Sequence, residues 1–211
     1  MPEVSAVVLA GGQSRRLGTN KAFIEIGGQT LIERVLQIIS PLAEDVIVVT
    51  SEAEPFCHLG VRLTGDVYPG KASLGGIYSG LLAAKHQQAL VVGCDMPFLN
   101  GGLLRYMISL AGEYEIIIPS YDSFLEPLHA IYHKQCLEPM RLLIEADRLR
   151  ISEVFCTGRI RYITAEEIAA FDPAHLSFFN INTPEDLLRA REWVQFLQKE
   201  QSVSELRMVI G

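Results

Sequence analysis

The sequence predicts a single α/β domain with a mostly parallel sheet and helices on both of its faces. Short apolar segments alternate with segments of helical period along the chain, which is typical of doubly wound sheets with right-handed crossovers. No repeat, low-complexity tract or flexible linker divides the 211 residues, and 49% of them are hydrophobic. We therefore expect one domain over residues 1–200 and a C-terminal tail over residues 201–211.

The predicted strands are short runs rich in Val, Ile and Leu without a polar face, as expected for strands buried on both sides. They comprise, in chain order, residues 4–10, 45–50, 61–63, 89–94, 115–119 and 128–132. A shorter extended piece over residues 23–26 precedes a turn at Gly27 and Gly28. Ligands of open α/β sheets bind outside the carboxyl ends of the strands, so the residues that follow these strands are the candidates for a site.

The predicted helices are recognised by capping residues and by apolar positions at helical spacing. Thr30 and Glu33 form a capping-box pattern before the first helix, which Pro41 ends. Thr164 and Glu167 repeat the pattern before a short helix. Further helices are expected at residues 74–86, 103–110 and 134–148, and from Thr183-Pro184 to about Lys199. These helices supply the crossovers that a parallel sheet requires.

The overall charge is negative, since 25 Asp and Glu outnumber 18 Lys and Arg and give a formal net charge of −7. A protein that holds duplex nucleic acid normally carries a basic surface, so we expect no nucleic-acid partner. A polyanionic ligand would have to be met by a local cluster of cations.

The cysteines and the N-terminus indicate a cytoplasmic protein. The four cysteines form no CxxC pair, which argues against a zinc site or a thioredoxin-like motif. The N-terminus lacks the basic and apolar regions of a signal peptide, and no apolar run reaches the roughly 20 residues that span a bilayer. We expect no membrane association.

A glycine-rich, basic loop follows the first predicted strand. Its sequence over residues 9–21 is LAGGQSRRLGTNK, in which Arg15, Arg16 and Lys21 supply cations beside consecutive backbone N–H groups. Such a loop suits a triphosphate, because glycines allow close approach and N–H groups can form an anion-binding nest. It is neither a Walker A loop nor a GxGxxG fingerprint. A plain glycine-rich turn with solvated arginines is the alternative, and local features support both equally.

Two aspartates occupy similar places after later strands. Asp95 directly follows the strand at residues 89–94, where a hard divalent cation could bridge it to phosphate oxygens. Asp66 follows the strand at residues 61–63 and could accept hydrogen bonds from a nucleoside. Taken alone, Asp95 is more readily explained as a helix cap or turn residue, and Asp66 as part of a plain turn.

Together these segments resemble a known family. LAGGQSRRLGTNK at residues 9–21, LGGI at 74–77, GCDMP at 93–97, EPL at 126–128 and NINTP at 180–184 occur in this order. The set resembles the molybdenum cofactor guanylyltransferase (MobA) family, within the wider Rossmann-like nucleotidyltransferases. The resemblance extends from Ala6 to about Leu188. It implies a fold of the nucleotide-diphospho-sugar transferase type, and transfer of GMP from GTP to molybdopterin with Mg²⁺ and release of pyrophosphate.

The resemblance also implies roles for individual residues. Arg15, Lys21 and Asp95 would be catalytic, with Asp95 holding Mg²⁺ and Lys21 binding the triphosphate. Asp66 would contact the nucleoside, and the EPL segment would line the side of the pterin. The remaining nucleotide- or pterin-binding positions would be Leu9, Ala10, Gly11, Asn180 and Asn182. GTP and molybdopterin would be the partners of a monomer that transiently contacts molybdoenzymes or their chaperones.

The chain departs from the family pattern at two places. Asn20 stands where the family usually has Asp, and Ala72-Ser73 replaces a Gly-Pro pair, which bears on the choice of guanine over cytosine. The alternatives are a cytidylyltransferase acting on the same pterin, a sugar-phosphate nucleotidyltransferase, and a non-catalytic nucleotide-binding delivery protein. A nicotinamide-dependent dehydrogenase is disfavoured by the missing GxGxxG.

Overall fold

The central sheet has eight strands, and all but two of them run in the same direction. The computed structural model describes residues 2–11, 20–122, 124–156 and 158–210, with the backbone alone for residues 156 and 198–210. The strand order is β10-β7-β9-β6-β1-β4-β5, with β8 paired to β7. The strands are β1 Ser5–Leu9, β4 Asp45–Val49, β5 Arg62–Thr64, β6 Gln88–Gly93, β7 Ile116–Tyr121, β8 Phe124–Leu125, β9 His129–His133 and β10 Ile160–Ile163.

Strand β9 is antiparallel to both of its neighbours, β6 and β7, and β8 is antiparallel to β7. The pairs β1–β4, β1–β6, β4–β5 and β7–β10 are parallel. The expected mostly parallel sheet is therefore confirmed. The sequence did not predict strand β8, which pairs with β7, or the edge strand β10.

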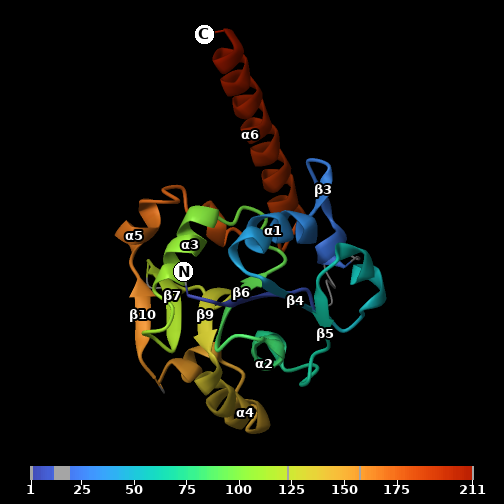
Figure 1. Cartoon of the computed structure of the whole chain (residues 1–211). Coiled ribbons are helices and arrows are strands. Elements are labelled where there is room, and N and C mark those ends of the chain that lie inside the picture. Colours follow the sequence, from blue (N-terminus) through green and yellow to red (C-terminus); the bar gives the residue numbers. More distant parts are fainter. Residues whose placement is uncertain (1, 12–19, 123, 157, 211) are drawn as a thin grey trace.

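The α-helices cover both faces of the sheet, as predicted. They are α1 Leu31–Ile39, α2 Ala72–Ala83, α3 Gly101–Ser109, α4 Leu137–Glu145, α5 Ala165–Ala169 and α6 Pro184–Ile210. Figure 1 shows α1, α3 and α5 on one side of the sheet and α2 and α4 on the other. Each side has its own apolar core: Val8, Val35 and Leu104 belong to one, and Val7, Ile77 and Met140 to the other. Alternate residues of β1 thus serve opposite layers.

Short 3₁₀ helices and a small hairpin complete the fold. The 3₁₀ helices are η1 Lys21–Phe23, η2 Ser40–Leu42, η3 Glu54–Leu59, η4 Lys134–Cys136, η5 Ile151–Cys156 and η6 Leu176–Phe178. Strands β2 Glu25–Ile26 and β3 Gln29–Thr30 form the hairpin around Gly27 and Gly28, which both have positive φ. The capping boxes predicted at Thr30 and Thr164 are both formed.

Helix α6 extends further than the sequence led us to expect. We predicted that it ends near Lys199, but it continues to Ile210 through the residues expected to form the tail. The chain contains no Gly or Pro between Pro184 and Gly211, so nothing in the sequence interrupts the helix. Figure 1 shows its C-terminal part projecting from the body of the domain. Within the described residues, none of the helices has the length and apolar character needed to cross a bilayer.

Helix α2 lies unusually close to the sheet because glycines face it. A Cβ atom at Gly80 would collide with Val7 Cγ1 on β1, and one at Gly76 would lie 3.3 Å from Leu9 Cδ1. A larger residue at Gly80 would have to push the helix away from β1, whereas one at Gly76 would require a small shift of the Leu9 side chain. This close packing brings the N-terminal end of α2 to the carboxyl end of β1, where the site lies.

Candidate functional site

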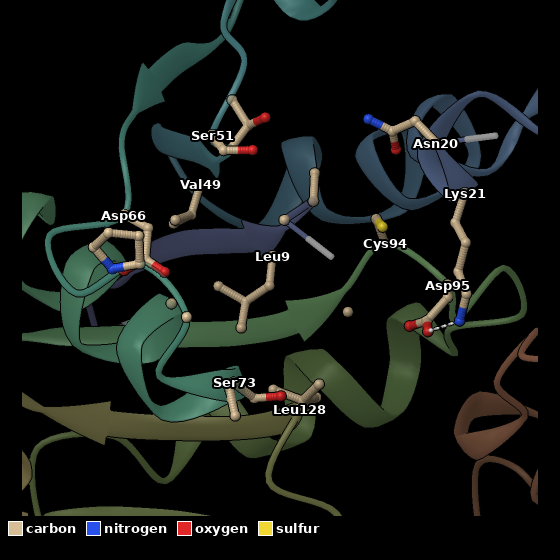
Figure 2. A pocket seen from close by; sticks show the side chains of 18 residues that line it. Leu9, Asn20, Lys21, Val49, Ser51, Asp66, Ser73, Cys94, Asp95 and Leu128 are labelled. Carbon is tan, nitrogen blue, oxygen red and sulfur yellow. Dashed lines mark hydrogen bonds and ion pairs between the residues drawn. The ribbon is translucent and has the colours of Figure 1, made fainter. Parts of the chain in front are cut away.

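A cavity of about 490 Å³ lies at the carboxyl ends of β1, β4 and β6. Its lining comes from residues 9–11, 20–21, 49–51 and 93–95, from positions between 66 and 76, and from Leu128. Figure 2 shows Leu9 and Val49 on its floor, Asp66 on one side, and Lys21 with Asp95 on the other. The volume falls within the range of small-molecule sites, about 300–1,000 Å³. The cavity therefore has the place and size expected for a ligand of an open α/β sheet.

Lys21 forms the centre of a polar cluster at one end of this cavity. Its Nζ donates to Asn182 Oδ1 at 2.7 Å and lies 3.3 Å from Asp95 Oδ2. The side chains of Lys21 and Asp95 are each 21% exposed, so both can reach a ligand (Figure 2). A lysine ammonium has three N–H donors, and two of them are used here. No described residue accepts from the third, which is therefore available to an anion in the cavity.

Asn20 positions Lys21 at the start of η1. The Asn20 side chain accepts a hydrogen bond from the Ala22 amide at 3.1 Å and so caps this 3₁₀ turn. An aspartate at this position would accept the same hydrogen bond through its carboxylate. The departure from the family pattern therefore leaves the local geometry of the loop end intact.

Asp95 is placed by strand β6 and by a backbone contact with a distant segment. Its carbonyl accepts a hydrogen bond from the Ile181 amide at 3.0 Å, which brings residues 180–182 to the cavity. Gly93, two residues earlier, leaves room for the carboxylate, because a Cβ there would lie 2.6 Å from Asp95 Oδ1. Nearby, burial raises the pKa of the Glu126 carboxyl, and the charge of Asp95 adds to this effect. At this end of the cavity the carboxylate of Asp95 is therefore paired with the ammonium of Lys21.

Asp66 is held firmly at the side of the cavity. Its Oδ1 accepts from the Tyr68 amide at 3.0 Å and lies 2.9 Å from Ser79 Oγ on α2. Its Oδ2 has no hydrogen-bond partner within the part of the chain that the structure describes. A fixed carboxylate with one free oxygen can accept hydrogen bonds from ligand hydroxyls or amines.

The carboxylates of the cavity do not form a complete metal site by themselves. Across the described ranges, no group of three or more His, Cys, Asp or Glu side chains could hold a metal ion. Asp95 faces the cavity and could share a cation with a bound phosphate. This donor set fits Mg²⁺, which is usually held by one or two carboxylates together with substrate phosphates and water.

The structure brings most of the sequence-predicted residues together. Leu9, Ala10, Gly11, Lys21, Asp66 and Asp95 all line the cavity. Asn182 joins them through Lys21. Asn180 does not line the cavity; its Nδ2 donates to the Phe178 carbonyl at 3.1 Å. Arg15 lies outside the described residues.

Several lining residues were not singled out from the sequence. Thr50 and Ser51 follow β4 at the same edge of the sheet, and Cys94 precedes Asp95. Burial raises the pKa of the Cys94 thiol to about 12, so it lines the cavity as a neutral group. The signal that pointed to Asp95, a polar residue directly after a buried strand, applies equally to Thr50 and Ser51.

Residues 6–154 match the family model described as the MobA-like NTP transferase domain. The chain belongs to this family. It is 35% identical over 191 residues to a protein of Pelotomaculum thermopropionicum named "Probable molybdenum cofactor guanylyltransferase", covering 90% of this chain and 93% of that protein. It is 34% identical to the "Molybdenum cofactor guanylyltransferase" of Desulfosudis oleivorans, covering 90% and 95% of the two chains.

A solved structure from the same family supports the fold over nearly the whole length. The molybdopterin-guanine dinucleotide biosynthesis protein A of Archaeoglobus fulgidus superposes with a TM-score of 0.79 and 29% identity. The match covers 91% of this chain and 99% of that one. Membership of the MobA-like family makes this chain a nucleotidyltransferase, and the cavity at the carboxyl edge of its sheet is the candidate site.

Proposed function

We propose that this chain transfers GMP from GTP to molybdopterin in a Mg²⁺-dependent reaction that releases pyrophosphate. The main observation behind the proposal is that Lys21 contacts both Asp95 and Asn182 at one end of a cavity of about 490 Å³. Relatives at 34–35% identity bear the name of this activity, which supports the choice of substrates.

The reaction needs positioning and charge neutralisation more than acid–base chemistry. The terminal phosphate of molybdopterin is already anionic at neutral pH, so its attack on the α-phosphate of GTP requires no strong general base. A bond forms between the acceptor oxygen and the α-phosphorus, and the bond to the leaving pyrophosphate breaks. Negative charge increases on the transferred group and on the pyrophosphate. Cations fixed beside these groups lower the barrier.

Lys21 is suited to this task because it is already oriented. Its contacts with Asp95 and Asn182 hold the ammonium at the cavity wall, and its remaining N–H can donate to a phosphate oxygen.

Asp95 would hold Mg²⁺, which when bound supplies positive charge to the phosphate oxygens. Asp66 would accept from the nucleoside through its free Oδ2. Leu9, Ala10 and Gly11 would contact the nucleotide with little side-chain bulk.

The first experiment is pyrophosphate release by the purified full-length chain with molybdopterin and Mg²⁺, run in parallel with GTP, CTP, ATP and UTP. Release with GTP alone supports the proposal. Release with CTP instead identifies a cytidylyltransferase, and turnover of a hexose phosphate identifies a sugar-phosphate nucleotidyltransferase. Absence of release with all four, beside a working control transferase, points to another acceptor or to a nucleotide-binding delivery protein.

The variant Asp95→Asn tests the assigned site within the same assay. The amide keeps the shape of the side chain but is a poor Mg²⁺ ligand. We expect turnover to fall by orders of magnitude and the dependence on Mg²⁺ concentration to shift upward. The control is Lys85→Ala, because the Lys85 side chain is exposed and lies outside the cavity. Full activity of Asp95→Asn would remove the assignment.

A further inference from the structure

A third apolar core borders the polar cluster of Lys21, Asp95 and Asn182. It joins the β2–β3 hairpin, the segments after β6 and before α6, and the first half of α6; its buried members are Ile26, Leu31, Ile181, Ala190 and Val194. Ile24 and Phe98, three residues after Lys21 and Asp95, pack against it, and Asn182 directly follows Ile181. The packing of this core therefore bears on where all three polar side chains lie.

Trp193 on α6 links two of these segments. Its ring lies edge-on to Phe179 at a centroid distance of 4.7 Å and edge-on to Phe98 at 5.6 Å. The rings of Phe98 and Phe179 are themselves 6.1 Å apart. Such contacts add to the stabilisation that burial of the rings provides. Trp193 thus connects α6 both to the segment that carries Asp95 and to the segment that carries Asn182.

The start of α6 is bound directly to Asn182. The Asp186 carboxylate on α6 accepts from the Asn182 amide at 3.1 Å and from the Thr183 amide at 2.9 Å. Thr183 Oγ1 in turn accepts from the Asp186 amide at 3.2 Å, which closes a reciprocal cap. A displacement of α6 would therefore move Asn182, whose Oδ1 accepts from Lys21 Nζ at 2.7 Å.

We propose that Trp193 is a positioning residue for nucleotidyl transfer, which holds α6 against the third core and so keeps Asn182 at Lys21. The inference rests on the proposed function and adds to it a residue outside the cavity, because Trp193 is not among the residues that line it. Charge stabilisation by Lys21 depends on the place of its ammonium beside the phosphates. A misplacement of about 1 Å caused by a distant substitution can lower the rate by about 100-fold.

The first test compares kcat for pyrophosphate release in Trp193→Ala, Trp193→Phe and Ile168→Ala. Ile168 on α5 is fully buried in another core and does not line the cavity, so its truncation destabilises the domain without reaching the cluster. We expect Trp193→Ala to lower kcat by about 10- to 100-fold, and Trp193→Phe to restore most of it through its remaining edge-on contacts. Ile168→Ala should keep its kcat despite a lower melting temperature. Trp193→Leu replaces Trp193→Ala if that variant fails to fold.

A double-variant cycle with Asn182→Ala separates positioning from general destabilisation. If Trp193 acts through Asn182, the combined variant should lose less than the product of the two separate losses in kcat. The control cycle pairs Ile168→Ala with Asn182→Ala, and its losses should multiply.

The emission of Trp193 gives a measurement that does not depend on turnover, since it is the single tryptophan of the chain. We expect GTP with Mg²⁺, at saturation judged by calorimetry, to change this emission in the wild type. The change should be absent in Asn182→Ala at saturating nucleotide, because the contact that transmits it is removed.

The outcomes separate the inference from the proposed function. An unaltered kcat in Trp193→Ala, an equal loss in Ile168→Ala, or losses that multiply in the Trp193 cycle would overturn the inference alone. Release with CTP instead of GTP removes the choice of guanine, and the same variants then decide the inference with CTP. In a wild type that binds nucleotide but releases no pyrophosphate, an emission change that Asn182→Ala abolishes supports the inference, and a constant emission overturns it. A wild type that binds none of the four nucleotides removes both.

Discussion

Lys21 and Asp95 are 74 residues apart in the sequence, yet Lys21 Nζ lies 3.3 Å from Asp95 Oδ2. Lys21 follows β1 by way of the loop, and Asp95 follows β6, which pairs with β1 in parallel register. Two adjacent parallel strands end at the same edge of the sheet, so the segments after them meet there. The topology thus places a cation and a carboxylate beside one another at the cavity.

Replacing Lys21 with alanine should lower kcat for pyrophosphate release by about 10²- to 10³-fold, the usual effect of losing one preorganised donor to transition-state charge. The fold should persist, because Lys21 lies at the cavity wall and belongs to none of the apolar cores. Steady-state kinetics and a melting curve check both expectations. A kcat within a factor of about two of the Lys85→Ala control would refute the role of Lys21.

Replacing Gly93 with alanine should impair catalysis through Asp95. The added Cβ would lie 2.6 Å from Asp95 Oδ1 and must displace the carboxylate. We expect kcat to fall and the Mg²⁺ requirement to rise. Gly101→Ala is the matched control, since the nearest atom to its Cβ, Ile38 Cγ2, is 3.8 Å away. Identical activity in the two variants would show that Asp95 adjusts freely.

Replacing Gly80 with alanine should destabilise the domain by about 1–3 kcal/mol, because overpacking forces α2 away from β1. The new methyl group would collide with Val7 Cγ1. Urea denaturation measures the change in the free energy of unfolding. Adding Val7→Ala removes the colliding group, so the double variant should lose less than the sum of the two single losses. Simple additivity would contradict the proposed clash.

Buried His129 should make stability depend on pH. Its side chain is fully buried, packs edge-on against Phe178 with ring centroids 5.0 Å apart, and has no hydrogen-bond partner for either ring nitrogen among the described residues. Burial lowers the pKa of His129 from 6.5 to about 4, and the charge of Asp172 opposes this only partly.

The native state therefore keeps His129 neutral, while the unfolded chain takes up a proton as pH falls below 6.5. This part of the stability is present above pH 6.5 and is lost progressively as pH falls to about 4, by about 3 kcal/mol in total. Urea denaturation between these pH values should show a steeper loss for the wild type than for His129→Leu. His58→Gln, at an exposed position, should follow the wild type. Parallel slopes for the wild type and His129→Leu would rule out His129 as the source.

The sequence predicted most elements because their signals are local. Uniformly apolar runs marked β1, β4 and β6, and the capping boxes at Thr30 and Thr164 marked the starts of α1 and α5. Strand β10 was missed because Arg161 and Tyr162 interrupt its apolar pattern at the edge of the sheet. Helix α6 was predicted too short because its C-terminal half carries no strong apolar period, although it also carries no breaker.

Of the site, the sequence determined the kinds of group present: a glycine-rich loop with Lys21, aspartates directly after strands, and the asparagines before the last helix. Residues that follow parallel strands share an edge of the sheet, and this made it possible to place Lys21, Asp66 and Asp95 at one edge from the sequence. The tertiary structure decided which side chains touch. It paired Lys21 with Asn182, turned Asn180 toward the Phe178 carbonyl, and inserted β9 antiparallel between β6 and β7.

These decisions depend on packing between segments far apart in the chain. An apolar strand has the same composition in either direction, so nothing local reveals that β9 runs against its neighbours. The ring contacts of Trp193 likewise exist only where α6, the segment after β6 and the segment after η6 converge. The sequence alone thus determined which chemical groups are present and at which edge of the sheet they lie. Only the tertiary structure decided which of them are in contact, because those contacts join residues that are far apart in the chain.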